Sequence, residues 1–244
     1  MKQTDQGEEI FHWMNELDLA SEIEQITDNL IRSQYKPFID GSINAPVPFR
    51  GEGEIKLIIL GQDPTVQNPE YRKKIKVTLL LNQPGGLRNY LGNICNGLGI
   101  NLDKNVYATN LLKNFFTKPP DQIRKEKSEF MQLVAAYWIP LLIKEISVFP
   151  NIPVLTLGEP ILNCLLKTSD RVLIRNYWGY KGPALYDENF YFIPSEENVL
   201  NRSIFPFPHI HGLKKKLYMS QIGGYVKFMR KMTNQFILSE RSIE

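Results

Sequence analysis

Side chains with useful chemistry follow several short apolar runs of this 244-residue chain. Gln62 and Asp63 come directly after one such run, Asn110 follows a second, and His209 and His211 lie in a proline-rich stretch further on. A carboxylate can orient a water molecule and stabilise a developing positive charge. An amide can pair with both a carbonyl oxygen and an N–H group, and an imidazole can donate a hydrogen bond to a leaving group.

The apolar runs and the segments between them predict an α/β protein in which strands and helices alternate. Such connections cross from strand to strand in a right-handed sense, so the sheet should be mostly parallel. We therefore predict a three-layer α/β/α sandwich with a central, mostly parallel four-stranded sheet. The polar side chains would then meet at the carboxyl ends of the strands, where ligands bind in such sheets. The predicted strands are 56–60, 105–109, 154–157 and 191–193, and the predicted helices are 7–33, 87–98, 121–147, 161–166 and 215–237.

The composition is that of a globular protein, and we expect residues 1–244 to form a single domain with an acidic helical extension over residues 1–35. Apolar residues make up 43% of the chain, which is enough for a buried core. The longest apolar run, 133–143, has eleven residues, whereas a membrane-spanning helix needs about 20. No apolar signal core follows the first residues, and Cys95 and Cys164 are too few for a disulfide framework. We expect a cytoplasmic monomer that does not contact a membrane.

Charge is distributed unevenly along the chain, although the formal net charge is only +3. Residues 5–31 contain eight acidic residues and no Lys or Arg, while residues 198–239 contain seven basic residues and no acid. Four more basic residues lie within 72–76. Such clusters are typical of proteins that bind a polyanion such as nucleic acid. The plain alternative is that each run forms a solvated helix face.

Four segments of the sequence, in this order, resemble the uracil-DNA glycosylase superfamily. The first is Pro-Phe-Arg at 48–50 with Lys-Leu-Ile-Ile-Leu-Gly-Gln-Asp-Pro at 56–64, which is similar to the family's first strand and water-activating loop. The second, Val-Tyr-Ala-Thr-Asn-Leu-Leu-Lys at 106–113, resembles the strand that carries the base-reading Asn. The third runs over 130–158 and ends in Val-Leu-Thr-Leu-Gly. The fourth, Pro-Phe-Pro-His-Ile-His-Gly-Leu at 206–213, stands where the family has its His-Pro-Ser loop.

The resemblance spans about residues 48–230 and implies a monofunctional DNA glycosylase. Such an enzyme hydrolyses the N-glycosidic bond of uracil, or of a related deaminated base, in DNA without a metal or another cofactor. It implies that Asp63 and His209 are catalytic: the carboxylate orients water and stabilises the sugar cation, and the imidazole donates to the leaving base. The base-binding residues that it implies are Gln62, Leu80, Asn110 and His211.

Two of these side chains could also have ordinary structural roles. An Asp after a strand is often a helix N-cap or a turn residue, and Asn110 could cap the end of its strand. The segment 77–81, where the family stacks a phenylalanine on the base, has no aromatic residue. Stacking would then fall to Phe115 or Phe116, both of which could equally belong to the core.

Two further parts of the sequence depart from the family pattern. Direct alignment on His-Pro-Ser-Pro places Phe205 where the family has its histidine. Either the functional imidazole is that of His209, or it is that of His211, or the chain has no catalytic histidine. Thr65 and Val66 replace a Tyr-His pair whose tyrosine excludes the methyl group of thymine, so this exclusion should be looser here.

The residues after the histidines fit the task of reaching a base inside a duplex. A base is flipped out with the help of a small apolar wedge and of contacts that hold the DNA backbone. We expect Leu213 to be the wedge, and Lys113, Lys214, Lys215 and Lys216 to contact the backbone. An ordinary helix start with solvent-facing basic residues is about equally compatible with this segment.

Three other functions would use different chemistry. A degenerate member of the family would bind nucleic acid or a damaged base without cleaving it. A metal hydrolase could use Asp63, His209 and His211, since a His-x-His pair can bind zinc, but no further histidine lies nearby and we expect no metal. A nucleotide-binding α/β protein would need a glycine-rich phosphate loop after the first strand, and the sequence lacks one there.

Overall fold

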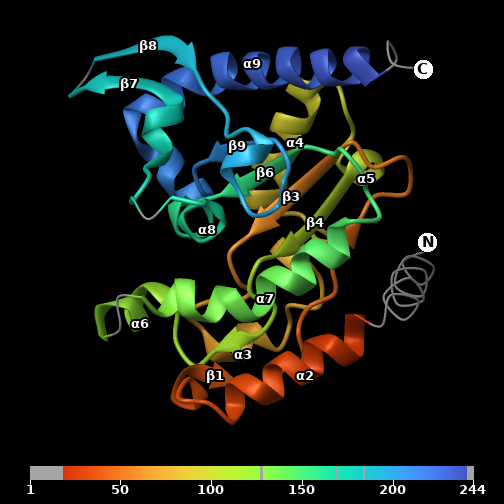
Figure 1. Cartoon of the computed structure of the whole chain (residues 1–244), viewed down its shortest axis with the longest axis vertical. Coiled ribbons are helices and arrows are strands. Elements are labelled where there is room, and N and C mark those ends of the chain that lie inside the picture. The colour runs from red at the N-terminus through yellow and green to blue at the C-terminus, as the bar shows by residue number, and fades with distance from the viewer. Residues whose placement is uncertain (1–18, 127–128, 169, 184, 241–244) are drawn as a thin grey trace.

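The computed structural model describes residues 19–126, 129–168, 170–183 and 185–240, and its centre is a five-stranded mixed sheet (Figure 1). The strands lie in the order β2-β4-β3-β6-β9. The last four are parallel to one another, and β2 is antiparallel to β4 at one edge. These strands are β2 (Phe49–Arg50), β3 (Leu57–Gly61), β4 (Val106–Asn110), β6 (Val154–Leu157) and β9 (Ile204–Phe207).

Continuous apolar runs form the four parallel strands. Every residue of β3, β4, β6 and β9 is buried, which is the pattern of strands covered on both faces. The strands predicted at 56–60, 105–109 and 154–157 are confirmed as β3, β4 and β6. The α/β class and the mostly parallel sheet are therefore confirmed, whereas the sheet has five strands instead of the predicted four.

The fourth predicted strand, 191–193, is wrong. Ile193 makes an isolated bridge to Ile204, and the fourth parallel strand of the sheet is β9. This strand contains Pro206, a residue that weighs against a strand when only the sequence is read. Because β9 lies at the edge of the sheet, a residue without an N–H group is tolerated there.

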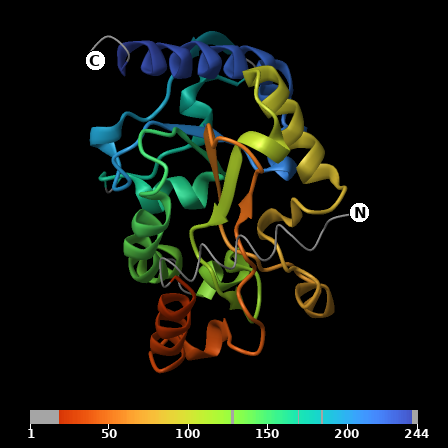
Figure 2. The ribbon, with the colours of Figure 1, turned by 90° about the vertical axis from the view of Figure 1, so that its right-hand side faces the viewer.

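Helices lie on both sides of the sheet in Figure 2, with α4 on one side and α7 and α8 on the other. Helices α2 and α9 lie at opposite ends of the molecule in both views. Side chains such as Leu91 of α4 and Trp138 of α7 are fully buried in the core. The helices are α2 (Leu19–Ile31), α3 (Pro69–Arg72), α4 (Gly86–Leu98), α5 (Leu102–Asn105), α6 (Pro120–Glu126), α7 (Phe130–Ile146), α8 (Glu159–Leu165) and α9 (Lys216–Glu240).

Two small antiparallel sheets, β1 with β5 and β7 with β8, complete the strands of the described residues. The pair β7–β8 packs on α9, where the ring of Trp178 stacks on Tyr225 with centroids 4.4 Å apart. The remaining strands are β1 (Ile39–Asp40), β5 (Phe115–Phe116), β7 (Trp178–Gly182) and β8 (Leu185–Phe190), and the 3-10 helices are η1 (Lys36–Phe38), η2 (Thr78–Leu80), η3 (Ile174–Tyr177), η4 (Ser195–Glu197) and η5 (Ile210–Lys214).

The helices differ from the sequence prediction over residues 121–147 and in the short helices α3 and α5, which were not predicted. The single helix predicted over 121–147 is two helices, α6 and α7. The helices predicted over 87–98, 161–166 and 215–237 are confirmed as α4, α8 and α9 with small shifts at their ends. The helix predicted over 7–33 is confirmed where it is described, as α2, and residues 1–18 of the acidic extension lie outside the described residues.

The order of the strands places a switch point between β3 and β6. The chain passes from β3 to β4 on one side and then returns past β3 to reach β6 on the other. In open sheets of this kind, ligands bind outside the carboxyl ends of the strands at such a point. The loops after β3, β4 and β6 are therefore where the fold would hold a ligand.

Candidate active site

The loop after β3 holds the Asp63 carboxylate through two neighbouring residues. The backbone N–H of Thr65 donates to Asp63 Oδ1 at 2.8 Å, and Gln62 Nε2 donates to Asp63 Oδ2 at 2.9 Å. The first bond is the one that an Asp commonly makes in a turn, so the ordinary structural role is also present. Gln62 and Asp63, both predicted site residues, thus contact each other at the carboxyl end of β3.

Burial raises the pKa of Asp63 from its ordinary value of 3.8 to about 6. Hydrogen bonds from Thr65 and Gln62 favour the charged form and oppose this rise, whereas the nearby charge of Asp121 adds to it. Asp63 is therefore mostly ionised at neutral pH and becomes protonated in mildly acidic solution. Carboxyl groups perturbed in this way occur often at functional sites.

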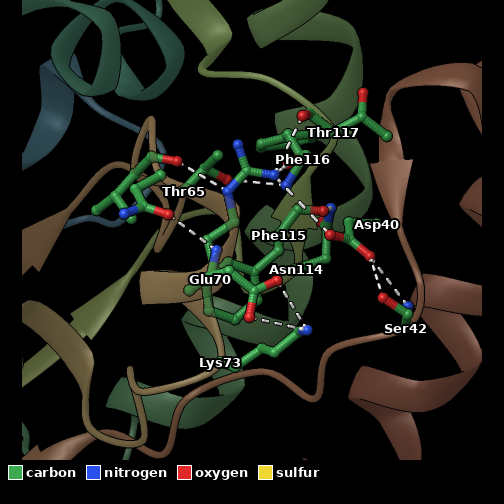
Figure 3. A network of polar contacts seen from close by, with 12 residues as sticks. Asp40, Ser42, Thr65, Glu70, Lys73, Asn114, Phe115, Phe116 and Thr117 are labelled. Atoms are coloured by element: carbon green, nitrogen blue, oxygen red, sulfur yellow. Dashed lines mark hydrogen bonds and ion pairs between the residues drawn. The ribbon is translucent and has the colours of Figure 1, made fainter.

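Buried polar contacts attach this loop to the short strand β5 (Figure 3). Thr65 Oγ1 accepts a hydrogen bond from the backbone N–H of Phe116 at 2.8 Å. The guanidinium of Arg72, which is 2% exposed, donates to the backbone carbonyl groups of Val66, Phe116 and Thr117. Hydrogen bonds within the loop hold Asp63, and hydrogen bonds to β5 hold the segment that follows it.

This network limits how many of the four basic residues of 72–76 are available to bind a polyanion. Arg72 is buried, and its Nη1 lies 3.9 Å from Asp40 Oδ2. Lys73 is exposed, but its Nζ pairs with Glu70 at 3.0 Å. Two of the four charges are therefore engaged within the chain.

Asn110 lies beside the same loop, and its side chain has no hydrogen-bond partner among the described residues. It is the last residue of β4 and stands opposite Gly61 in the register of β3 and β4. The residue is 2% exposed, and neither Nδ2 nor Oδ1 is hydrogen-bonded. The backbone N–H groups of Leu111 and Leu112 donate to the carbonyl oxygens of Gly61 and Gln62 at 2.8 and 2.9 Å, so the two loops lie side by side.

A buried amide without a partner is unusual, because the loss of water is normally balanced by hydrogen bonds. Gly61 makes room for this amide, since a Cβ atom there would overlap Asn110 Oδ1 and lie 2.7 Å from Leu79 Cδ2. Asn110, Gly61 and Leu79 thus form one side of a site whose free donor and acceptor a ligand could satisfy.

Leu79 reaches this site because the backbone turns sharply in η2. Leu79 and Leu80 have φ angles of 57° and 55°, in the left-handed region that costs roughly 1–2 kcal/mol for such residues. Backbone strain of this kind occurs mostly at functional sites. The resemblance implied Leu80 as a base-binding residue, whereas the leucine that a Cβ atom on Gly61 would meet is Leu79. A role for Leu80 stays a prediction.

Lys113 lies inside the fold, so its predicted contact with the DNA backbone is wrong. Its side chain is 6% exposed, and Nζ forms an ion pair with Glu145 Oε2 and donates to Thr109 Oγ1 at 2.5 Å. The hydroxyl of Tyr107 donates to the other oxygen of Glu145 at 2.6 Å. Burial lowers the pKa of Lys113, and the charge of Glu145 opposes this change. These buried contacts of Lys113 hold the turn that follows Asn110 against the core.

His209 and His211 lie in the loop after β9, with ring centroids 5.0 Å apart. His209 lines a cavity of about 900 Å³ together with Asp121, Glu159 and Tyr218, among other residues. Partial burial and the charge of His211 lower the pKa of His209, so its imidazole is neutral at neutral pH. This cavity lies at the carboxyl ends of β6 and β9.

The structure brings some of the predicted residues together and leaves others apart. Asp63 lies in the loop after β3 and Asn110 ends the adjacent strand β4, but neither lines the cavity that contains His209. Asp121 connects the loop of Asp63 with the cavity of His209, because it lines that cavity and its charge raises the pKa of Asp63. Sequence reasoning missed Asp121, because it follows Asp63 by 58 positions in the chain and belongs to no motif that points to the site.

The lysine run lies at the start of the last helix. Lys214 ends η5 and Lys216 begins α9, and all three lysines, including Lys215, are exposed. Lys215 also lines the cavity that contains His209. Leu213 is half-buried and lines a separate groove between α4 and α9, so a wedge role would require it to leave that groove.

No three His, Cys, Asp or Glu side chains of the described residues are grouped so that they could hold a metal ion. Asp63, His209 and His211 therefore do not form the group that a metal hydrolase would need. Cys95 and Cys164 are not joined in a disulfide, and the first of them is buried. Within the same residues, no helix is long and apolar enough to cross a membrane.

Neither models of known protein families nor curated proteins match this chain. The function is therefore inferred from the site and from the sequence segments that resemble a family.

Proposed function

We propose that the chain is a DNA glycosylase that hydrolyses the bond between deoxyribose and uracil, or a related deaminated base, in DNA. The observation that carries this proposal is the buried amide of Asn110, which has no partner among the described residues and lies beside Gly61 and the loop of Asp63. A free donor and a free acceptor suit the edge of uracil, which offers a carbonyl oxygen and an N–H group. We also propose that the chain has the three-layer sandwich of the superfamily, and that it acts as a cytoplasmic monomer without a metal or another cofactor.

Asp63 would act on the sugar side of the bond. In the hydrolysis, a water oxygen bonds to C1′ while the C1′–N1 bond breaks, the electron pair of that bond leaves with the base, and the proton that the water loses passes to the Asp63 carboxylate. The carboxylate, which is ionised above about pH 6, orients the water and stabilises the positive charge that develops on the sugar. Gln62 and Thr65 support this role because their hydrogen bonds keep the carboxylate in one orientation.

His209 would act on the base side of the bond. The departing base carries negative charge, which a neutral imidazole can stabilise by donating its N–H to a carbonyl oxygen. The lowered pKa of His209 supports this neutral form at neutral pH. His211, whose ring lies beside it, is the alternative donor.

A second candidate function is the binding of a damaged base without cleavage. It is favoured by one observation: His209 lines a cavity to which neither Asp63 nor Asn110 contributes. If these groups act on different ligands, the chain could recognise a base through Asn110 and lack the donor for the leaving group.

Base release from oligonucleotides that contain uracil, hypoxanthine, xanthine or a G·T mismatch tests both candidates. Uracil release, detected by alkaline cleavage at the abasic site, supports the enzyme, and Asp63→Asn should then lower the rate at least about 100-fold while binding persists. Asn110→Ala should weaken uracil binding, and the exposed-residue variants Asp28→Asn and Asn44→Ala are matched controls. Specific binding without release in any form supports the second candidate, and neither binding nor release overturns both.

A further inference from the structure

A long groove separates helices α4 and α9, away from the residues proposed to act on uracil. It has a volume of about 940 Å³ and is bounded at one end by η5. Its apolar lining comes from one residue of α4, two of η5 and two of α9, namely Ile94, Ile210, Leu213, Ile222 and Val226. Asp63, Asn110 and His209 do not line it. An occupant of this groove would therefore bind apart from the proposed site.

Two glycines show how the groove opens along the helices. At Gly97 the helices touch, because a Cβ atom there would lie 2.6 Å from Val226 Cγ1. Beside Gly223 there is open space, since a Cβ atom there would meet no atom within 4 Å. The lining residues of α9 extend from Ile222 to Asn234, which is about 18 Å at roughly 1.5 Å per residue. The part of α9 that lines the groove is thus about three helical turns long.

One wall of the groove is positively charged. Lys227, Arg230 and Lys231 are exposed and line it, and their spacing places them on one face of α9. No Asp or Glu lines the groove, and none of these three cations makes an ion pair within the described part of the chain. The wall formed by α4 offers the neutral amides of Asn89 and Asn93. An occupant with negative charge on one flank would complement this surface.

The lining favours a peptide over a nucleic acid strand. Single-stranded nucleic acids bind by stacking their bases on exposed rings. The one aromatic lining residue among those described is Tyr90, which is 6% exposed and donates its hydroxyl to Pro208 O at 3.0 Å, so it offers no stacking surface. An amphipathic helix places an apolar stripe in such a groove and its polar flanks along the rim. From these features we propose that the groove binds an acidic amphipathic helix of a partner protein.

Two synthetic peptides that differ only in charge test this proposal. Each has about 14 residues with Leu at positions i, i+3, i+4 and i+7, and the flanking positions carry Glu in one peptide and Lys in the other. Fluorescence anisotropy with the full chain at low salt should show that the Glu peptide binds at least about tenfold more tightly than the Lys peptide. The preference should weaken as salt is added.

Variants then locate the binding site. Lys227→Glu/Lys231→Glu should remove the preference for the Glu peptide, and Lys36→Glu/Lys104→Glu, which changes the charge equally at exposed positions outside the groove, should keep it. Gly223→Leu places a side chain in the open part of the groove and should abolish binding of the peptide. The fold should tolerate that change, because leucine is a better helix former than glycine and its Cβ atom would meet no atom within 4 Å.

Several results would overturn the proposal. Equal affinity for the two peptides, or binding of the Glu peptide that neither groove variant changes, would show that the groove does not select an acidic helix. Binding of oligothymidine that Lys227→Glu/Lys231→Glu alone abolishes would assign the groove to nucleic acid. A dimer that Gly223→Leu dissociates, seen by sedimentation, would assign it to a second copy of the chain.

Discussion

At the scale of single residues, the raised pKa of Asp63 makes the proposed activity sensitive to acid. The ionised carboxylate is the form that assists hydrolysis, so the rate of uracil release should fall about tenfold per pH unit below about pH 6. A single-turnover pH profile measures this inflection. Residual activity of Asp63→Asn should lack the inflection, and a flat profile for the unmodified chain would contradict a catalytic role for this carboxylate.

The same change in pKa destabilises the folded chain at neutral and basic pH. Because the folded-state pKa is about 6 and the ordinary value is 3.8, protonated Asp63 favours folding, and this stabilisation is complete below about pH 3.8 and lost as the pH rises through 6. Asp63→Asn, neutral at every pH, should therefore raise the free energy of unfolding at pH 8 by about 1–2 kcal/mol. The gain is smaller than for a fully enclosed carboxylate, because water still reaches part of this residue.

Urea unfolding at two pH values measures this effect. The gain of Asp63→Asn should be present near pH 8 and absent near pH 4, where the native carboxyl is already mostly protonated. A variant that is less stable than the native chain at both pH values would show that the hydrogen bonds from Thr65 and Gln62 outweigh the burial of the charge.

Gly61 should be indispensable for base binding but not for folding. In Gly61→Ala, the new Cβ would displace the Asn110 amide or Leu79, so the KM for uracil-containing DNA should rise by an order of magnitude or more. Gly92→Ala is a matched control, because a Cβ there meets no atom within 4 Å and alanine favours the helix. An unchanged KM for Gly61→Ala would show that the Asn110 amide does not bind the base.

Some of these residues could be placed from the sequence, and others could not. Gln62, Asp63 and Asn110 follow apolar runs, and parallel strands end at one edge, so their proximity was predictable. Leu79 was not, because a run of leucines carries no sign of a left-handed backbone. Lys113 was misjudged because a lysine in a polar loop is usually exposed, and its partner Glu145 is 32 positions away in the chain.

At the scale of elements, the ion pair between Lys113 and Glu145 joins the turn after β4 to helix α7. Lys113→Met alone leaves Glu145 buried without its cation and should destabilise the fold by about 3–5 kcal/mol. The double variant Lys113→Met/Glu145→Leu, which removes both charges, should recover most of this loss. Chemical denaturation of the two variants measures the difference, and equal destabilisation in both would show that the pair itself, and not the unpaired charge, determines stability.

The strands also show where periodicity misleads. Tyr191 to Ile193 and β9 are both short apolar runs, and the second contains Pro206, which argues against a strand when only the sequence is read. The edge position of β9, which permits the proline, depends on the whole sheet and cannot be read locally. Similarly, no glycine or proline lies between α6 and α7, so the sequence predicts one continuous helix there.

At the scale of the whole molecule, the acidic run and the basic run of the sequence include helices that lie far apart in space. Helix α2, which belongs to the acidic run, and helix α9, which belongs to the basic run, lie at opposite ends (Figure 1). The sequence predicted the two runs but not their separation, which follows from the order of the strands and the helices between them. A polyanion would therefore approach from the α9 end, where the lysines at the start of that helix are exposed.

Salt dependence of DNA binding tests this orientation. Lys214→Ala/Lys215→Ala/Lys216→Ala should weaken binding to uracil-free DNA uniformly across sequences, because interactions with phosphates carry no sequence information. The slope of log affinity against log salt should decrease by up to about 0.9 for each phosphate that the variant no longer neutralises.

The triple variant Lys36→Ala/Lys56→Ala/Lys104→Ala, which removes the same charge from exposed positions elsewhere, should change the slope little. If both triple variants change the slope equally, only net charge matters, and the α9 end does not face the DNA. If Lys214, Lys215 and Lys216 alone matter, the loop with His209 lies against the DNA backbone, because Lys215 and His209 line one cavity. Electrostatic attraction would then position the same substrate that the buried amide is proposed to read.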